Sequence, residues 1–187
     1  MNKMEAVKAV LGACGPDDLI ICCNGMIGRE LYTGGDRPTI FYMIGSMGLA
    51  LSIGLGVALA RPKRRVVVLD GDGNVLMGMN ALASVASEAP PNLLHIVLDN
   101  HTHASTGGQR TISREIRLES VASAAGYRAT HRAETPEGFE ASLRAARAQA
   151  GPVMVIGVVE GGTTKGIGRV EPTPPELAAR FAAEARR

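Results

Sequence analysis

The chain has 187 residues, of which 45% are hydrophobic, 20% are charged and 3% are aromatic. This length suits one domain with a sizeable buried core, and we expect a single domain over residues 1–187. The formal net charge of +2 argues against a general affinity for nucleic acid or for an anionic membrane. With no Trp, three Phe and three Tyr, the chain also lacks an aromatic surface on which exposed bases stack.

Helical patterns and apolar runs alternate along the chain. In order, the sequence predicts helix 2–12, strand 19–23, helix 26–34, strand 40–44, helix 47–60, strand 65–69, helix 75–88, strand 93–98, a loop over 99–113, helix 117–125, strand 127–131, helix 136–149, strand 153–159, a mobile loop over 161–166 and helix 174–186. Continuously apolar strands are typical of a parallel sheet that is buried on both faces. We therefore expect an α/β fold, a doubly wound, mostly parallel sheet with helices on both faces, which binds ligands beyond the carboxyl ends of its strands.

Two features bear on the compartment. The three cysteines, Cys14, Cys22 and Cys23, have neither an even count nor a metal-binding spacing, so we expect buried reduced thiols. Residues 40–60 carry no charge and are long enough to cross a bilayer. Their glycines and the surrounding α/β alternation instead favour a short strand, a glycine turn and a fully buried helix. The amino-terminal residues lack the apolar core of a signal peptide, so we expect a cytoplasmic protein.

Polar residues follow two of the predicted strands directly. Gly71, Asp72, Gly73 and Asn74 come after one strand, and Asn100 comes after the next. The glycines let a phosphate approach the main chain, and the start of the following helix offers free N–H groups to an anion. A carboxylate, an amide oxygen and a main-chain carbonyl at adjacent strand ends can complete, with diphosphate and water, the octahedral shell of Mg²⁺.

This spacing resembles the diphosphate-binding domain of thiamine diphosphate enzymes, whose signature is Gly-Asp-Gly, a spacer of this length, and Asn. The resemblance implies thiamine diphosphate and Mg²⁺ as cofactors, with Asp72, the Asn100 side chain and the Thr102 carbonyl as metal ligands. It also implies that Met47 supports the bent cofactor and that the Gly45 carbonyl accepts from its 4′-amino group. The implied cofactor-binding residues are Gly45, Ser46, Met47, Gly71, Asp72, Gly73, Asn74, Asn100 and Thr102.

Further motifs narrow the resemblance to the sulfopyruvate and phosphonopyruvate decarboxylases. They are the segments 24–31, 36–38, 41–48 and 105–109. The resemblance implies decarboxylation of a 3-sulfo- or 3-phosphono-2-oxo acid to an aldehyde and CO₂. Such enzymes also need a glutamate on a separate pyrimidine-binding domain, and we assign that role to none of Glu30, Glu88 and Glu160, because none lies in the motif of that glutamate. The chain is thus expected to be the β-like half of a two-subunit enzyme, with a separate α subunit supplying the glutamate, and to self-associate.

The polar residues after position 100 offer candidates for the remaining roles. His103 and His101 can transfer a proton to the decarboxylated intermediate, because imidazole titrates near neutrality, or they can be solvated loop residues. Ser105, Thr106 and Gly107 can bind the second anion of the substrate or form an ordinary turn. His95, in an apolar strand, is expected to be a core residue.

Two other functions remain open at this point. One is a subunit of another thiamine diphosphate enzyme, either an acetolactate synthase-like carboligase or a 2-oxo acid oxidoreductase. The other is a cofactor-binding paralogue without turnover. The products distinguish the two enzyme classes, since only simple decarboxylation releases a free aldehyde.

Overall fold

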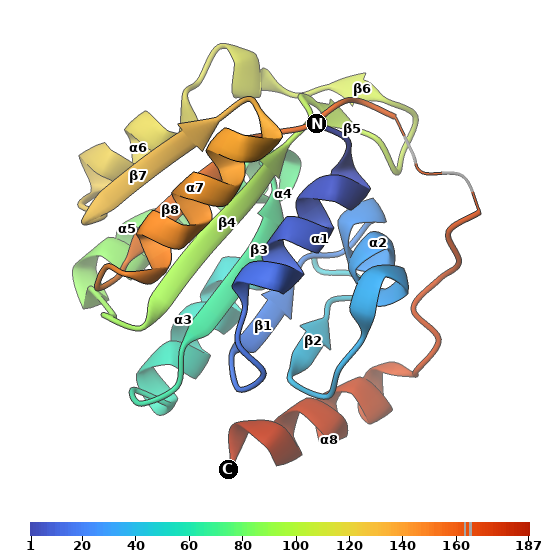
Figure 1. The fold of residues 1–187 in the computed structure, drawn as a ribbon, viewed down its shortest axis with the longest axis vertical. Helices are drawn as coiled ribbons and strands as arrows, with labels where there is room; N and C mark the ends of the chain where they lie inside the picture. The colour runs from blue at the N-terminus through green and yellow to red at the C-terminus, as the bar shows by residue number, and fades with distance from the viewer. Residues whose placement is uncertain (163, 165) are drawn as a thin grey trace.

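A computed structural model describes residues 1–162, 164 and 166–187. Thr163 and Lys165, in the predicted mobile loop, lie outside the described residues. The main sheet has six parallel strands in the order β2-β1-β3-β4-β8-β7 (Figure 1). These strands are β1 (Leu19–Cys22), β2 (Ile40–Tyr42), β3 (Val66–Gly71), β4 (Leu93–Asp99), β7 (Ala129–Ala133) and β8 (Val153–Val158). The predicted α/β fold is confirmed.

Helices cover both faces of this sheet. Helices α1 (Lys3–Ala13), α2 (Met26–Gly35) and α7 (Pro136–Arg147) pack into one apolar core, and α3 (Ala50–Ala60), α5 (Asn80–Glu88) and α6 (Leu118–Ala125) pack into the other. In Figure 1, α1 and α7 lie in front of the sheet and α3 lies behind it. The short helix α4 (Asp72–Met77) follows β3 without a loop. Strand β1 lies between β2 and β3, so the chain changes direction in the sheet next to β1, and this is where doubly wound sheets bind ligands.

Local signals set where several helices begin. Asn2 and Glu5 form a reciprocal capping box at α1, because each side chain accepts a hydrogen bond from the other residue's main-chain N–H at 2.9 Å. The Thr135 hydroxyl accepts from Gly138 N–H at 3.1 Å and caps α7. These caps satisfy N–H groups that have no partner inside the helix. The helices over residues 3–13 and 136–147 therefore start close to where the sequence predicts.

Two predicted helices differ from the structure. The helix predicted over 47–60 begins only at residue 50, because Ser46 and Gly48 have positive φ angles of 55° and 89° and cannot continue a right-handed helix. The helix predicted over 75–88 is two helices, α4 and α5, with the break at Gly78. A Cβ atom at Gly78 would lie 2.0 Å from the Gly48 carbonyl oxygen. The break is thus where two main-chain segments touch.

The predicted loop over 99–113 has structure of its own. Strands β5 (Thr102–His103) and β6 (Gln109–Arg110) form a short antiparallel hairpin, and a 3₁₀ turn, η1 (Ile112–Arg114), follows. The strand predicted over 127–131 instead spans residues 129–133. Gly126, with φ of 116°, ends α6 in the left-handed conformation, and Tyr127 N–H still bonds to the Ala122 carbonyl of that helix. The strand therefore starts two residues later.

The uncharged segment 40–60 is also only partly as predicted. Its carboxyl-terminal part, α3, buries one face, but Leu49 and Leu59 beside that face are 50% and 48% exposed. The prediction of a fully buried helix is therefore wrong. A helix that is apolar on all sides has no hydrophobic periodicity that would indicate which side is exposed. None of the helices in the described part of the chain is both long enough and apolar enough to span a membrane. All three cysteines are free thiols, and Cys22 and Cys23 are buried as predicted.

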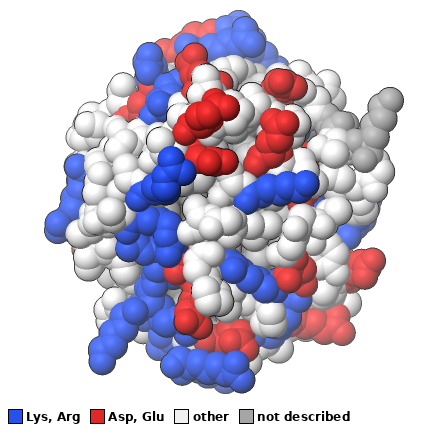
Figure 2. All heavy atoms as spheres, in the orientation of Figure 1, with Lys and Arg blue, Asp and Glu red and all other residues white. Residues whose placement is uncertain are grey.

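The last helix, α8 (Pro174–Ala185), packs against the edge strand β2, at the bottom of Figure 1. The Arg180 guanidinium donates two hydrogen bonds to the Asp36 carboxylate, at 2.7 and 3.0 Å, and a third to the Ile40 carbonyl of β2 at 3.5 Å. The ring centroids of Phe41 and Phe181 are 5.6 Å apart. Figure 2 shows acidic and basic side chains mixed over one face of the molecule.

Candidate active site

The predicted site residues gather at the carboxyl ends of β1, β3 and β4. These ends lie side by side, with Cys22 opposite Leu69 and Gly71 opposite Leu98 in the parallel register. They surround a narrow hollow with a volume of about 70 Å³. Its walls are formed by Lys3, Asn24, Gly25, Met26, Ile27, Met47, Gly71, Asp72, Gly73, Asn74, Leu98, Asn100, Thr102, His103, Ala104 and Ser105.

A larger groove lies elsewhere. It has a volume of about 570 Å³ and runs between α1 and α7. It contains none of the predicted site residues. Size alone would favour this groove, but the residues predicted to bind the diphosphate and the metal border the smaller hollow, so we place the candidate site there.

Gly73 leaves the space into which two predicted residues pack. A Cβ atom at Gly73 would lie 2.8 Å from Cε1 and Nδ1 of His103 and 3.1 Å from Cε of Met47. Real Cβ atoms do not approach ring atoms this closely, so glycine is required for this arrangement. The structure thus brings Gly73, Met47 and His103 together, although they come from three separate segments of the chain.

Asn74 holds the turn that carries Met47. Its side-chain oxygen accepts a hydrogen bond from Gly48 N–H at 3.0 Å, and this bond is buried. The Gly-Asp-Gly-Asn segment is therefore tied to the glycine turn before α3. Gly45 and Ser46, which were predicted to contact the cofactor, are exposed and do not border the hollow, whereas Met47 does.

Asp72 is the buried carboxylate of the site, with a residue exposure of 3%. Its Oδ2 atom accepts a hydrogen bond from the Thr111 hydroxyl at 2.5 Å and a longer one from the Ser113 hydroxyl at 3.3 Å. Burial raises the pKa of Asp72 above its ordinary value, and the charge of Asp99 raises it further, while the hydrogen bond from Thr111 opposes the shift. A cation at this carboxylate would relieve the cost of its buried charge.

The candidate metal ligands lie on the same hollow. Asn100 Oδ1 accepts from Thr102 N–H at 3.2 Å, which closes a turn directly after β4. Among the residues that the structure describes, no cluster of three or more His, Cys, Asp or Glu side chains could hold a metal ion. A cation here would therefore be held by one carboxylate together with neutral oxygens of the Asn100 side chain and the Thr102 main chain. Such an all-oxygen set suits Mg²⁺.

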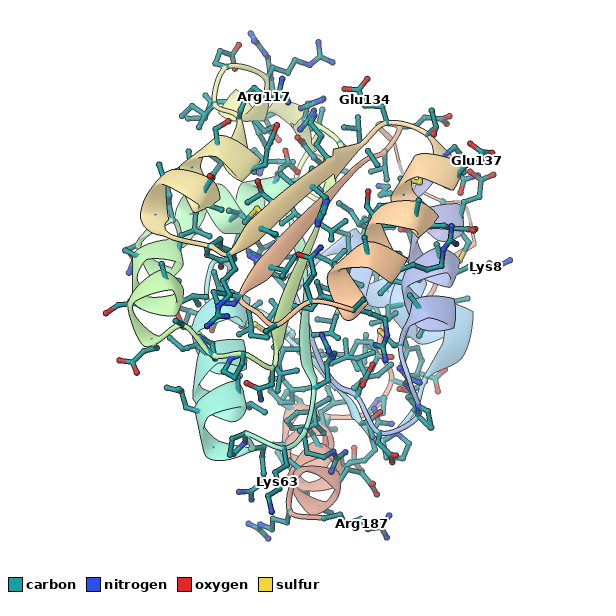
Figure 3. The ribbon with its side chains drawn as sticks, turned by 60° about the vertical axis from the view of Figure 1, so that its left-hand side comes forward. Lys8, Lys63, Arg117, Glu134, Glu137 and Arg187 are labelled. Atoms are coloured by element: carbon teal, nitrogen blue, oxygen red, sulfur yellow. The ribbon has the colours of Figure 1, made fainter. Side chains whose placement is uncertain are left out.

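The two candidate proton donors point to different places. His101 has a positive φ of 59°, and its Nδ1 atom lies 2.7 Å from Ser113 Oγ and 3.0 Å from Asp99 Oδ1. His101 instead borders a neighbouring hollow that Arg117 and Glu134 also line. Figure 3 shows Arg117 and Glu134 at one end of the molecule. His103 borders the candidate site itself. The geometry therefore favours His103 for contact with a ligand there.

Of the three predicted anion-binding residues, only Ser105 borders the hollow. The Thr106 hydroxyl bonds within its own hairpin, where its oxygen lies 3.1 Å from Gln109 Oε1 and 3.3 Å from the His103 carbonyl oxygen. Gly107 is exposed and has a φ of 128°. These two residues shape the β5–β6 turn.

Sequence reasoning missed four residues of this region. Lys3, on α1, is 5% exposed, borders the hollow and donates a hydrogen bond to the Gly162 carbonyl. Thr111 and Ser113 contact Asp72 from beyond the hairpin. Asn24 also borders the hollow and has a buried, unpartnered side-chain oxygen. Only Asn24 gave a signal, since it opens one of the motifs that carry the family resemblance.

His95 lies in the core, as predicted. It is fully buried, its Nδ1 atom lies 3.4 Å from the Tyr127 hydroxyl, and its Nε2 atom lies 3.5 Å from Asp70 Oδ2. It does not border the candidate site.

The fold and the site together define a doubly wound α/β domain with a small hollow and oxygen donors at its switch point. Over residues 21–156 the chain matches the family described as thiamine pyrophosphate enzyme, C-terminal TPP binding domain. The chain belongs to this family. The resemblance to thiamine diphosphate enzymes is thereby confirmed.

Individual relatives agree with this assignment. The chain is 46% identical over 182 residues to the phosphonopyruvate decarboxylase of Streptomyces viridochromogenes, covering 97% of this chain and 46% of that protein. It is 46% identical over 127 residues to the sulfopyruvate decarboxylase subunit beta of Methanothermobacter thermautotrophicus, covering 68% of each. The chain thus spans about half the length of the phosphonopyruvate decarboxylases that it matches.

A solved structure shares the fold. The thiamine diphosphate-dependent 4-hydroxybenzoylformate decarboxylase of Rhodococcus jostii RHA1 superposes with a TM-score of 0.73 at 21% sequence identity, over 88% of this chain and 33% of that one. At this level of identity the likeness concerns the fold alone.

Proposed function

We propose that this chain is the diphosphate-binding subunit of a thiamine diphosphate- and Mg²⁺-dependent decarboxylase. Its substrate is a 2-oxo acid with a second anionic group at C3, of the sulfopyruvate or phosphonopyruvate type. The observation that carries the proposal is the meeting of Asp72, Gly73, Asn100, Met47 and His103 on one hollow at the ends of β3 and β4.

The residues present fit the cofactor. A side chain at Gly73 would collide with His103 and Met47 on the wall of the hollow, and the oxygen donors suit Mg²⁺ bound to a diphosphate. Asp72, the Asn100 side chain and the Thr102 carbonyl would hold the metal, and Met47 would support the bent cofactor from below. When bound, thiamine diphosphate supplies the nucleophilic carbon and the electron sink for decarboxylation.

The chain's own residues would then orient the substrate and move a proton. Overall, the 2-oxo acid loses CO₂ and takes up one proton at the former carboxylate-bearing carbon, which gives the aldehyde. We assign the delivery of that proton to the His103 imidazole, and its packing on Gly73 at the wall of the hollow supports this role. Ser105 and Lys3, on the wall of the same hollow, are candidates for contact with the substrate's anions.

A second polypeptide is needed for turnover in this proposal. No glutamate borders the hollow in the described part of the chain, and the relatives of similar length are named as beta subunits. Ile44, Leu49 and Met77 are 54%, 50% and 67% exposed; Leu49 and Met77 directly adjoin the touching glycines 48 and 78, and Ile44 starts the turn before them. We assign this apolar rim to the pyrimidine-binding subunit, because water-exposed apolar groups beside an incomplete site suit a protein partner.

The test uses the chain alone and mixed with the product of an adjacent reading frame. We expect titration calorimetry to show thiamine diphosphate binding that requires Mg²⁺, and aldehyde release from sulfopyruvate or phosphonopyruvate only in the mixture. Asp72→Ala should abolish the Mg²⁺-dependent binding. Asp17→Ala, at an exposed carboxylate before β1, is the matched control and should bind normally.

Four results would contradict the proposal. Asp72→Ala with unchanged cofactor affinity would mean that the metal lies elsewhere. Turnover by the chain alone would remove the need for a partner. A ketol or an acyl-CoA product would assign the chain to a carboligase or an oxidoreductase, and cofactor binding without any turnover in the mixture would favour a non-catalytic paralogue.

A further inference from the structure

Two buried carboxylates lie close together beneath the hollow. Asp72 follows β3 and Asp99 ends β4, and the two residues are 3% and 1% exposed. Like charges that are both removed from water repel each other and lose their hydration, so they require hydrogen-bond donors nearby.

Two hydroxyl groups from a distant segment supply donors to this pair. The Thr111 hydroxyl donates to Asp72 Oδ2 at 2.5 Å, and the Ser113 hydroxyl donates to Asp99 Oδ1 at 2.8 Å. The two hydroxyl oxygens are 3.0 Å apart, and both residues are 3% exposed. Each hydroxyl has one proton. The shortest contacts with carboxylate oxygens therefore give one proton to each acid, and the pair of hydroxyls bridges Asp72 and Asp99, while the Ser113 oxygen also lies 2.7 Å from His101 Nδ1.

Thr111 also closes the chain segment that carries several residues of the candidate site. Thr111 N–H donates to the His101 carbonyl at 3.0 Å, which closes the chain between residues 101 and 111 into a loop around the β5–β6 hairpin. Asn100 immediately precedes this closed loop, and Thr102, His103 and Ser105 lie within it. Any shift of Thr111 would therefore move these groups relative to Asp72.

We propose that Thr111 and Ser113 are positioning residues for the metal and diphosphate site. The Thr111 hydroxyl donates to Oδ2 of Asp72 and so fixes the rotation of that carboxylate, and the Ser113 hydroxyl oxygen lies 3.3 Å from the same atom. Ser113 also holds the start of the loop after β4. Its hydroxyl donates to Asp99 Oδ1, and the same oxygen accepts a hydrogen bond from His101 N–H at 3.1 Å. The inference rests on the proposed function, since it assigns these residues to the binding of Mg²⁺ and thiamine diphosphate.

The test measures cofactor binding separately from folding. Titration calorimetry of the full chain with thiamine diphosphate at saturating Mg²⁺, and with Mg²⁺ at saturating cofactor, gives both affinities. Thr111→Val keeps the shape and removes the hydroxyl, and we expect both affinities to fall by about 10- to 100-fold, the usual loss for a group that orients a metal ligand. Thr111→Ser restores the hydroxyl and should bind within about threefold of the wild type. Ser113→Ala, the second variant, should weaken binding in the same direction.

A control separates positioning from general destabilisation. The Asn92 side-chain amide donates to the carbonyls of Ala58, Arg61 and Arg64, at 3.1, 3.0 and 2.8 Å. Asn92 directly precedes β4, so this cluster lies at the amino end of the strand, away from the hollow. Asn92→Ala should lower stability toward urea and leave both affinities within about threefold.

The outcomes decide between the two ideas. If the wild type binds and folded Thr111→Val and Ser113→Ala bind equally well, the positioning role is refuted and the proposed function stands. If Asn92→Ala loses affinity as strongly as Thr111→Val does, or if neither hydroxyl variant folds, the hydroxyls serve stability and the inference fails. If the wild type does not bind thiamine diphosphate with Mg²⁺, the proposed function fails, and the inference fails with it.

Discussion

The contact between Gly48 and Gly78 offers a sharp test of how the site is held. In Gly78→Ala, the new Cβ atom would lie 2.0 Å from the Gly48 carbonyl oxygen, 2.8 Å from its carbonyl carbon and 3.1 Å from its Cα atom. Gly78 has a φ of −105°, which alanine adopts without strain. The cost of the substitution therefore comes from the contact alone, and the atoms that it meets are main chain and cannot rotate away.

The size of the effect follows from the distances. Because real Cβ contacts are essentially never under 3.0 Å, the two segments must separate by about 1 Å. Overpacking of this kind costs about 1–3 kcal/mol. The separation also stretches the buried hydrogen bond from Gly48 N–H to Asn74 Oδ1, which is 3.0 Å long, and its loss costs roughly 1–3 kcal/mol. We expect Gly78→Ala to lower the free energy of unfolding by about 3 kcal/mol and to weaken cofactor binding, because Met47 moves with Gly48.

Urea unfolding followed by far-ultraviolet circular dichroism measures this change, and it suits a chain without tryptophan. Gly12→Ala and Gly56→Ala are matched controls, since both glycines are exposed in helices and no atom lies within 4 Å of the added Cβ. Each control should gain roughly 0.5–1 kcal/mol from helix propensity. A Gly78→Ala variant that unfolds at the same urea concentration as the wild type or later would refute the steric argument.

Two further predictions concern the charge at the site and the exposed rim. Burial raises the pKa of Asp72, so the ionised carboxylate lowers stability above its folded pKa, and this cost disappears below its unfolded pKa. Without Mg²⁺, the Asp72→Asn variant should unfold at a higher urea concentration than the wild type at pH 7, and this difference should shrink as the pH is lowered to about 4. An equal or lower urea midpoint at pH 7 would contradict the assignment of the raised Asp72 pKa to burial. Met77→Lys, at a side chain that is 67% exposed, should change the free energy of unfolding by less than roughly 0.5 kcal/mol and reduce copurification with the partner subunit by about tenfold or more. Unimpaired copurification would place the partner elsewhere.

Much of the fold could be predicted from local sequence. Continuous runs such as Val66–Leu69 indicate buried parallel strands, and a polar residue directly after such a run must lie at the carboxyl edge of the sheet. Asp72 and Asn100 meet for this reason. Met47 was placed beside them only by the family resemblance, and His103 only because it follows Asn100 closely in the chain; the structure brings all four to one hollow. Their roles in binding and catalysis stay predictions.

Other parts depend on contacts between distant residues, which no local pattern reveals. Thr111 and Ser113 reach Asp72 only because the hairpin folds back, and their sequence neighbours do not distinguish them from an ordinary loop. His101 and His103 are two residues apart, yet a left-handed main-chain conformation at His101 turns its ring away from the hollow. The break at Gly78 likewise arises from a segment 30 positions earlier in the chain.

The position of α8 bears on how this protein avoids aggregation. In a parallel sheet the outer strand leaves every second peptide group without a partner, and such a row can recruit a strand of another molecule. The Arg180 guanidinium occupies one of these acceptors, the Ile40 carbonyl, while it is itself anchored to Asp36. The helix therefore protects the sheet from growing through β2. Removing α8 should promote the addition of a strand from another molecule at β2, even where the carboxyl ends of the strands that carry the candidate site are intact.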